Sequence, residues 1–294
     1  MAKLFGNLFN PQPLTHETNS NHLYLIMKLN EIYNENCLKT MGRMPNGFVD
    51  LTVTSPPYDQ LRDYKGYKFP FKHIARQLHR VTKDGGVVVW VVGDQTVNGS
   101  ETGTSFKQAL FFMELGFRLH DTMIYKKTGG GARGSNLAYW QNFEYMFVFS
   151  KGTPKAINLI YDKPNSKAGS RDSGVNGRNK DGSKRYKTVG TVAEISKREN
   201  VWIIPAGNNT ADDKTEHPAV FPESLANDHI ISWSNAGDIV YDPFGGSGTT
   251  AKMAHLNGRN WIISEMSKDY CEIAHKRIQP YIKQTALFTP TPPF

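Results

Sequence analysis

The chain has 294 residues, of which 38% are apolar and 12% aromatic, so it can bury a hydrophobic core and does not have the composition of a disordered protein. Two cysteines, Cys37 and Cys271, are too few for a disulfide framework or a zinc site by themselves, so we expect a reducing, cytoplasmic location and no metal. No apolar run approaches the roughly 18 residues of a membrane-spanning helix, and the N-terminus lacks the order of a signal peptide, so no membrane partner is expected. The net charge of +8 favours a polyanionic partner.

From Leu29 onward, strand-like apolar runs alternate with helical patterns, which predicts a mostly parallel sheet joined by crossover helices. In chain order we expect strands at 48–53, 87–92, 118–125, 145–149, 238–241 and 261–264. We expect helices at 71–81, 105–115, 222–233, 249–256 and 268–278. Asp84-Gly85-Gly86 is predicted to be a turn.

The chain divides into segments by composition. Residues 1–28 show no clear periodicity and are expected to be a flexible N-terminal tail, and residues 281–294 a C-terminal tail. Residues 151–200 hold twelve Lys or Arg and only five Asp or Glu, so most of the net charge lies in this segment. Its apolar periodicity is poor. We therefore expect one α/β domain in two halves, 29–150 and 201–280, with a basic insertion between them.

A glycine-rich turn joins the expected strand at 238–241 to the next helix. It runs from Asp242 to Gly248, and its glycines allow positive φ angles and the close approach of a ligand. The helix N-terminus offers N–H groups to a polar ligand, and Glu265, after the following strand, is placed to bind ribose hydroxyls. A Walker loop needs a lysine where Thr249 stands, and the glycine spacing is not that of a dinucleotide fingerprint. The turn fits a nucleoside cofactor without phosphates, such as S-adenosylmethionine; an ordinary strand-to-helix turn is the alternative.

A second motif, Thr54-Ser55-Pro56-Pro57-Tyr58, follows the expected strand at 48–53. Its two prolines fix φ and remove backbone donors, which leaves nearby carbonyl groups to accept hydrogen bonds. A loop at the carboxyl end of a parallel strand lies where open α/β sheets bind ligands. The hydroxyl of Ser55, the carbonyl of Pro56 and the ring of Tyr58 together suit the exocyclic amine of a base that has left the duplex. The alternative is a plain polyproline turn.

The two motifs and their order resemble the β class of amino-group DNA methyltransferases. In that class the catalytic motif comes first, then a target-recognition region, then the S-adenosylmethionine motif, which is the order of residues 54–58, 151–200 and 242–250 here. The segments 143–146 and 217–223 match further parts of the family. The resemblance implies a Rossmann-like methyltransferase fold with circularly permuted motifs and helices on both faces of the sheet. It also implies S-adenosyl-L-methionine as cofactor and double-stranded DNA as substrate, with a homodimer and a cognate restriction endonuclease as candidate partners.

The same resemblance implies roles for individual residues. The residues of the catalytic motif that it marks are Ser55, Pro56, Pro57 and Tyr58. The residues that would bind or flank the cofactor are Asn36, Pro218, Phe221, Asp242, Phe244, Gly246, Gly248, Thr249 and Glu265. Asn36 stands where the family usually has an aspartate that contacts the adenine, and an amide can make that contact as well.

The serine of the catalytic motif bears on the product. Family members with serine at this position are mostly N4-cytosine enzymes and those with aspartate are mostly N6-adenine enzymes, so Ser55 favours N4 of cytosine. Methylation of cytosine C5 needs a thiolate in a Pro-Cys context, and neither Cys37 nor Cys271 follows a proline. We expect direct methyl transfer without a covalent enzyme intermediate. The alternatives are N6-adenine methylation by the same fold and a non-catalytic nucleic-acid-binding module that has kept the fold.

The basic segment is the expected target-recognition region. Its lysines and arginines can neutralise phosphates, and such contacts position a protein on DNA but do not read sequence. Base reading requires a few Arg, Lys, Asn or Gln side chains in the major groove. The candidates for DNA contact are Arg171, Arg178, Asn179, Lys184 and Arg185 in this segment, with Lys126 and Arg133 in or beside the glycine-rich stretch at 128–134.

Overall fold

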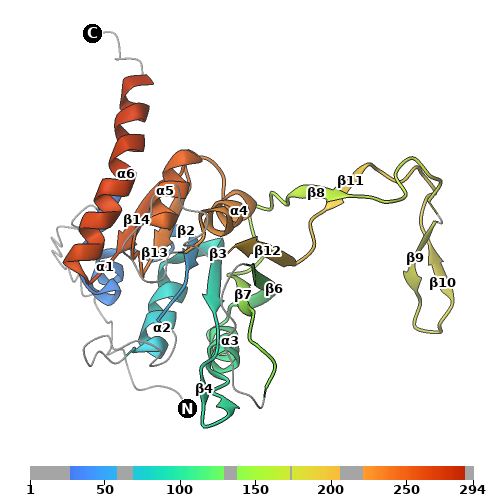
Figure 1. Cartoon of the computed structure of the whole chain (residues 1–294), viewed down its shortest axis with the longest axis horizontal. Helices are drawn as coiled ribbons and strands as arrows, with labels where there is room; N and C mark the ends of the chain where they lie inside the picture. The colour runs from blue at the N-terminus through green and yellow to red at the C-terminus, as the bar shows by residue number, and fades with distance from the viewer. Residues whose placement is uncertain (1–26, 58–68, 129–137, 173, 206–220, 289–294) are drawn as a thin grey trace, which may run out of the picture.

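The computed structural model describes residues 27–57, 69–128, 138–172, 174–205 and 221–288 of the chain (Figure 1). The strands are β1 (Glu31–Tyr33), β2 (Val49–Thr54), β3 (Thr82–Val92), β4 (Thr96–Val97), β5 (Ser100–Glu101), β6 (Arg118–Thr128), β7 (Phe143–Ser150), β8 (Tyr161–Pro164), β9 (Val175–Arg178), β10 (Lys184–Tyr186), β11 (Ile195–Lys197), β12 (Val201–Pro205), β13 (Ile239–Asp242) and β14 (Asn260–Ser264). The helices are α1 (Cys37–Arg43), α2 (Phe71–Val81), α3 (Thr104–Glu114), α4 (Glu223–Trp233), α5 (Thr249–Leu256) and α6 (Lys268–Phe288). Every strand and helix predicted from the periodicity is present.

The main sheet has the strand order β1-β14-β13-β2-β3-β7-β6-β12. β7 is antiparallel to both of its neighbours, β3 and β6, and all other neighbouring pairs are parallel. Parallel neighbours need crossover connections, which α2 supplies between β2 and β3 and α5 between β13 and β14. From β13 the chain continues to β14 on one side, and from β2 it continues to β3 on the other side. The strand order therefore reverses between β13 and β2. An open α/β sheet binds its ligands beside the carboxyl ends of the strands at such a point.

Helices cover both faces of this sheet (Figure 1). Residues of α4, α5 and α6 form one core cluster with the sheet, and residues of α1, α2 and α3 form the other. In β3, Val87, Val89 and Val91 belong to the first core, whereas Val88 and Trp90 belong to the second. A strand that is buried on both faces needs apolar residues at every position, which explains the continuous apolar run there. In the described part of the chain no helix is long and apolar enough to cross a membrane.

Four short strands form a narrow arm that projects from this body (Figure 1). β8 pairs with β11 near the body and β9 with β10 at the far end, both antiparallel. All residues of β8, β9 and β10 are exposed, which explains why this stretch lacks apolar periodicity.

Residues 151–160, predicted as part of the insertion, pack on the body instead. Ala156 is buried there, and Nδ2 of Asn158 donates to the carbonyl oxygens of Ile231 and Ser234 at the end of α4.

Two elements extend further than predicted. β3 begins at Thr82 and includes the stretch predicted as a turn, because Gly85 takes a φ of +83° and the pairing with β2 continues through a bulge. α6 continues through Pro280 to Phe288, into the predicted C-terminal tail. Proline inside a helix removes a backbone hydrogen bond, and the residues after Pro280 contact the body. Ile282 packs on the core, and Nζ of Lys252 lies 4.9 Å from the ring centre of Tyr281.

Candidate active site

Asp242 joins the two predicted motifs at the centre of the sheet. It ends β13, and the neighbouring strand β2 ends at Thr54. Its buried carboxylate accepts hydrogen bonds from Oγ1 of Thr54 at 2.6 Å, Oγ1 of Thr250 at 2.8 Å and the backbone N–H of Phe244 at 3.0 Å. One side chain therefore holds the end of β2, the glycine turn and the first turn of α5. Ser55 follows Thr54 directly, so its backbone is fixed relative to the glycine turn.

Two acidic groups give this region its electrostatic character. Burial raises the pKa of Asp242 to about 6, and the neighbouring charge of Glu265 adds to this, while hydrogen bonds from Thr54, Phe244 and Thr250 oppose it. Burial likewise raises the pKa of Glu265. Such a site favours a ligand that carries positive charge or hydroxyl donors.

The glycine turn has the predicted conformation. Gly246 and Gly248 take φ angles of +49° and +80°, in the left-handed region that favours glycine. A Cβ on Gly248 would lie 2.8 Å from the Cβ of Ala274 in α6, and a Cβ on Gly245 would lie 2.8 Å from side-chain atoms of Ile263. Gly245 and Gly248 are therefore required for packing inside the protein. The backbone N–H of Gly246, by contrast, is directed at Glu265.

Glu265 stands after β14 and faces the glycine turn. Its Oε2 accepts from the backbone N–H of Gly246 at 2.9 Å, and its Oε1 accepts from that of Ser267 at 2.7 Å. A backbone hydrogen bond from Met266 adds to these, and since a carboxylate has about four lone-pair sites, it can still accept from a ligand. This arrangement fits the two hydroxyls of a ribose, the role predicted for Glu265, and the contact itself stays a prediction.

The described part of the predicted catalytic motif, residues 54–57, lies near aromatic side chains, two of which, Phe69 and Trp90, were not predicted. Ser55 and Pro57 are partly exposed, Pro56 is buried, and Tyr58 lies outside the described residues. In the next strand of the sheet, Trp90 pairs with Thr54. The ring of Phe244 meets those of Phe69 and Trp90 edge-on, with centroid distances of 5.6 and 6.2 Å. Phe69 and Trp90 carry no local signal that distinguishes them from core residues, so only the fold could reveal them.

The remaining predicted cofactor residues have different surroundings. Asn36 is the N-cap of α1, and its Oδ1 accepts from the backbone N–H of Leu38 at 2.9 Å. Thr249 is buried, and Phe221 is half-buried against the core under α4, α5 and α6. Pro218 lies outside the described residues. Whether these residues contact the cofactor stays a prediction.

A buried ionic cluster contacts the glycine turn from the side of α4, α5 and α6. Nη1 of Arg277, in α6, donates to the carbonyl oxygen of Ser247 at 2.8 Å and to Oγ1 of Thr249 at 3.1 Å. Nη2 of Arg277 and Nζ of Lys252 both bind Oε1 of Glu223, at 2.7 and 2.9 Å. The cluster thus connects α4, α5 and α6 with the turn. The sequence did not predict it, because the three charged residues come from separate helices.

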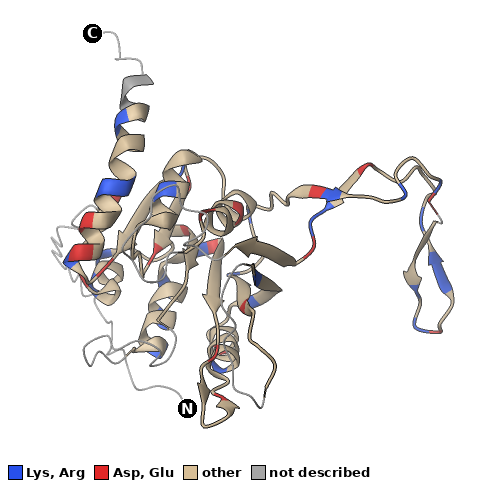
Figure 2. Ribbon diagram, in the orientation of Figure 1, with Lys and Arg blue, Asp and Glu red and all other residues tan. Residues whose placement is uncertain are grey.

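The predicted DNA contacts lie mainly on the arm. Arg171, Arg178, Asn179, Lys184 and Arg185 belong to it, and Figure 2 shows Lys and Arg along its length. Lys126 is exposed on β6, and Arg133 lies outside the described residues. Arg178 and Lys184 form a cross-strand pair at the far end. The arm therefore brings the basic candidates together on one narrow ribbon.

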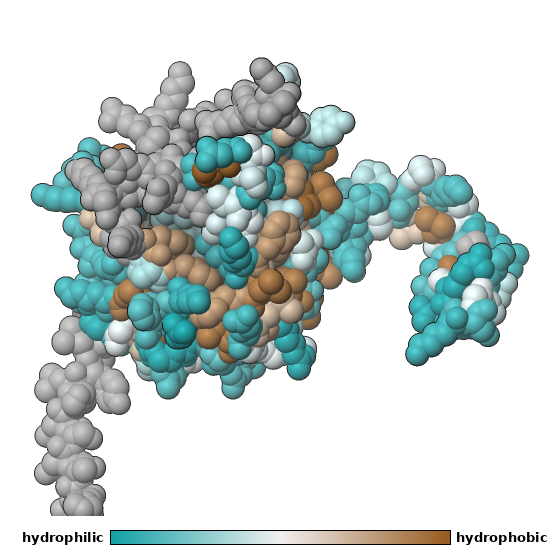
Figure 3. All heavy atoms as spheres, turned by 90° about the horizontal axis from the view of Figure 1, so that it is seen from below, coloured by the Kyte–Doolittle hydropathy of each residue, from teal (hydrophilic) through white to brown (hydrophobic). Residues whose placement is uncertain are grey.

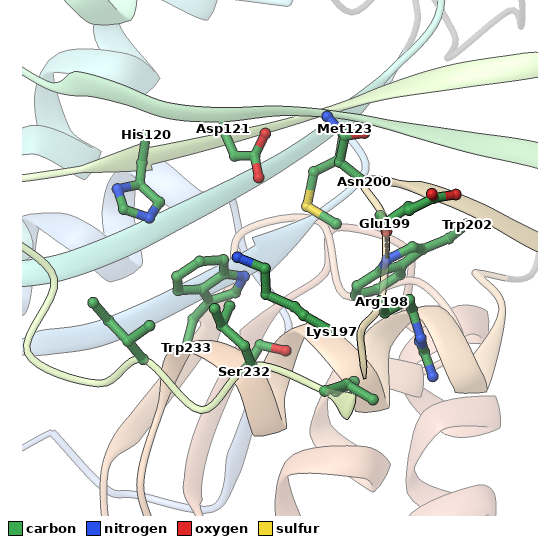
Figure 4. Close-up of a pocket in the computed structure, with 13 residues that line it drawn as sticks. His120, Asp121, Met123, Lys197, Arg198, Glu199, Asn200, Trp202, Ser232 and Trp233 are labelled. Atoms are coloured by element: carbon green, nitrogen blue, oxygen red, sulfur yellow. Dashed lines mark hydrogen bonds between the residues drawn. The ribbon is translucent and has the colours of Figure 1, made fainter. Parts of the chain in front are cut away.

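A cavity of about 190 Å³ lies at the base of the arm, between β6, the segment before β12 and the end of α4 (Figure 4). The rings of His120 and Trp233 are 5.2 Å apart in its wall, and the guanidinium of Arg198 lies 5.1 Å from the ring centre of Trp202. None of the predicted site residues lines it. The cavity is therefore separate from the candidate active site.

Comparison with known proteins agrees with the predicted family and fold. Residues 49–276 match the N6/N4 DNA methylase family. The orphan methyltransferase M.BamHII of Bacillus amyloliquefaciens is 57% identical over 239 residues, which cover 80% of this chain and 90% of that protein. The cytosine-N4-specific PvuII DNA methyltransferase superposes with a TM-score of 0.62 at 18% identity, over 86% of this chain and 91% of that one. The M1.HpyAVI–SAM complex has a TM-score of 0.55 at 22% identity, over 84% and 98% of the two chains.

The fold and these likenesses define a DNA methyltransferase that uses S-adenosylmethionine. The chain belongs to the N6/N4 amino DNA methyltransferase family. The predicted fold, a Rossmann-like α/β sheet with circularly permuted motifs, and the predicted cofactor are confirmed.

Proposed function

We propose that this methyltransferase modifies N4 of cytosine in duplex DNA, at a base flipped out of the helix. The observation that carries the proposal is the position of Ser55. It follows Thr54, which is hydrogen-bonded to Asp242, and Asp242 in turn holds the glycine turn. A serine at this position of the motif is typical of N4-cytosine members of the family. The PvuII enzyme, which has a similar fold, is cytosine-N4-specific, and this likeness supports the proposal.

The exocyclic amine of cytosine is a poor nucleophile because its lone pair is delocalised into the ring. Hydroxyl and carbonyl oxygens of Ser55 and Pro56 would accept the two amine hydrogens and favour a more tetrahedral nitrogen. Its lone pair would then be available to accept the methyl group. Tyr58 would stack on the flipped base, whose extrusion costs a few kcal/mol. After transfer the nitrogen would lose its extra proton to solvent, and no covalent bond to the protein would form.

S-adenosylmethionine supplies an electrophilic methyl group when bound. The residues that would hold it are Glu265 at the ribose, the backbone of Gly246 and the ring of Phe244. The edge-on packing of Phe244 against Phe69 and Trp90 would fix that ring in place. The acidic groups Asp242 and Glu265 favour the positively charged cofactor at this end of the sheet.

The test is methyl transfer from S-adenosylmethionine to mixed-sequence duplex DNA, followed by digestion and mass spectrometry of the nucleosides. We expect N4-methylcytosine. N6-methyladenine would reject the assignment to cytosine and keep the family. A protein that fails to bind S-adenosylmethionine in calorimetry would support the non-catalytic alternative.

The role of Ser55 is tested separately. Ser55→Ala should reduce methylation at least about 100-fold, the loss typical of a group that acts on the reacting centre, while cofactor affinity persists. Ser100→Ala, a matched change on the exposed strand β5, should leave methylation unchanged. Near-normal turnover of Ser55→Ala would remove this side chain from the mechanism.

A further inference from the structure

In its described residues, the arm is a two-stranded ribbon. Between its paired strands, the backbone N–H of Asn165 donates to the carbonyl of Glu194 at 2.9 Å and that of Gly169 to Val192 at 2.9 Å. Nearer the far end, the N–H of Lys187 donates to the carbonyl of Gly174 at 2.7 Å. The ladder therefore runs from β8 and β11 to the hairpin formed by β9 and β10, residues 175–187 (Figure 1).

This ribbon has no core of its own. The strands of its terminal hairpin are exposed on both faces, and a lone two-stranded hairpin is at best marginally stable in water. Figure 3 shows the arm as a mainly hydrophilic surface beside the body. The hairpin contains five Lys or Arg and one Asp. A basic two-stranded ribbon has the width and charge to enter the DNA major groove, which is about 12 Å wide and admits such a ribbon.

Arg185 is held across the surface of this hairpin. Its Nε and Nη2 both donate to the carbonyl oxygen of Asn176, at 3.1 and 3.0 Å. The side chain passes over Gly177, where a Cβ would lie 3.7 Å from Nη2 of Arg185, an ordinary van der Waals distance. The φ of Gly177 is +103°, which disfavours any other residue. The guanidinium therefore has one edge fixed on the backbone of the opposite strand while the side chain stays exposed.

An arginine anchored in this way is preorganised for a contact with a base edge. Guanidinium groups carry five N–H donors in a rigid fork, so the fixed edge leaves the Nη1 side of the group to face a ligand. Anchoring also lowers the conformational entropy that a long side chain loses on binding. The two acceptors O6 and N7 of guanine in the major groove match a pair of arginine donors, and this is the commonest base-specific contact in protein–DNA complexes.

We propose that the β9–β10 hairpin enters the major groove and that Arg185 reads a guanine in the target sequence. This assignment rests on the proposed action on duplex DNA. We assign different roles to two nearby residues, Arg178 and Lys180. Nη1 of Arg178 donates to the carbonyl of Gly182 at 2.8 Å and closes the turn of the hairpin. Lys180 is exposed in that turn and contacts phosphate, which contributes affinity but carries no sequence information.

The test uses the full-length protein with S-adenosylmethionine and a library of randomised duplex DNA, from which bound duplexes are sequenced. The wild-type protein should enrich a motif that contains guanine. Arg185→Lys keeps the charge but loses the fork, and it should lose about 5- to 150-fold of the preference for guanine at one position of that motif. Preferences at the other positions should remain. The matched control, Lys180→Ala, should keep the whole motif, bind all sequences more weakly and show a shallower dependence on salt.

Three outcomes overturn the assignment of Arg185: a motif without guanine, an Arg185→Lys variant that keeps every preference, or one that loses all preferences together, which would indicate a structural role. Failure of the proposed function itself is distinguishable. In that case the wild-type protein neither enriches a motif nor methylates any base, although it binds the cofactor.

Discussion

Asp242 illustrates how a single buried residue can hold several elements of a site together. Its carboxylate accepts hydrogen bonds from the end of β2, the glycine turn and the first turn of α5, and burial makes its negative charge costly. Burial with partial compensation by hydrogen bonds is the reason for its raised pKa. We therefore propose that Asp242 positions the predicted catalytic loop relative to the glycine turn.

The pH dependence of folding tests this view of Asp242. Its pKa is about 6 in the folded protein against 3.8 ordinarily, so the folded state binds the proton more tightly than the unfolded state. This group consequently makes the protein more stable as pH falls through 6 towards 4. Asp242→Asn removes the titration. From about pH 7 to about pH 5, the free energy of unfolding of the wild type should rise by roughly 1 kcal/mol relative to that of the variant. Parallel urea-unfolding profiles of the two proteins would contradict the raised pKa.

At the scale of elements, the glycine turn depends on helices that are far from it in sequence. Glu223 from α4, Lys252 from α5 and Arg277 from α6 meet behind the turn, where the two basic side chains are 4% exposed and the acidic one 19%. Such a buried cluster contributes little net stability when complete, because its members are desolvated. Losing one partner is costly, because the other charges are left buried without compensation.

Glu223→Ala should therefore destabilise the protein by about 3–5 kcal/mol, because Lys252 and Arg277 would lose their common partner. The free energy of unfolding by chemical denaturation measures this. Glu272→Ala is the matched control, since Glu272 lies 4.0 Å from Lys268 in an exposed pair of α6. Such surface pairs contribute about 0.5 kcal/mol or less. Equal effects of the two substitutions would show that the cluster does not support the fold.

On the scale of the whole molecule, the body and the arm differ in what stabilises them. The body has two apolar cores, one on each face of the sheet, whereas the arm is held by backbone hydrogen bonds and ion pairs such as Lys187 with Asp172. The body carries the candidate active site, and the arm carries most of the candidate DNA contacts. Cofactor binding and DNA recognition should therefore be separable.

Excision of the arm tests that separation. Asn165 and Glu194 are hydrogen-bonded across the ribbon, so residues 166–193 can be replaced by an Asn-Gly turn without spreading its ends. We expect cofactor affinity, measured by calorimetry, to stay within about twofold and Tm to shift little, because no core residue is removed. DNA methylation should fall at least about 100-fold, since the basic ribbon supplies the phosphate contacts. Loss of cofactor binding would show that the arm also stabilises the body.

Much of this architecture could be predicted from local patterns. The apolar periodicity located the strands and helices of the sheet because each element must bury a face or both faces. The glycines of the 242–248 turn and the prolines after Ser55 have backbone requirements that are visible in the residues themselves. Order along the chain then identified the family, since motif order does not depend on folded geometry.

Long-range contacts were decided only by the tertiary structure. The bond between Thr54 and Asp242 spans 188 residues. Phe69 and Trp90 look like ordinary core residues until the fold sets them against Phe244. The continuation of α6 past Pro280 depends on contacts with other elements, as does the anchoring of Arg185 on the opposite strand. Local sequence determined which elements form, whereas the packing of distant segments determined which side chains meet, because only a folded chain brings their atoms within contact distance.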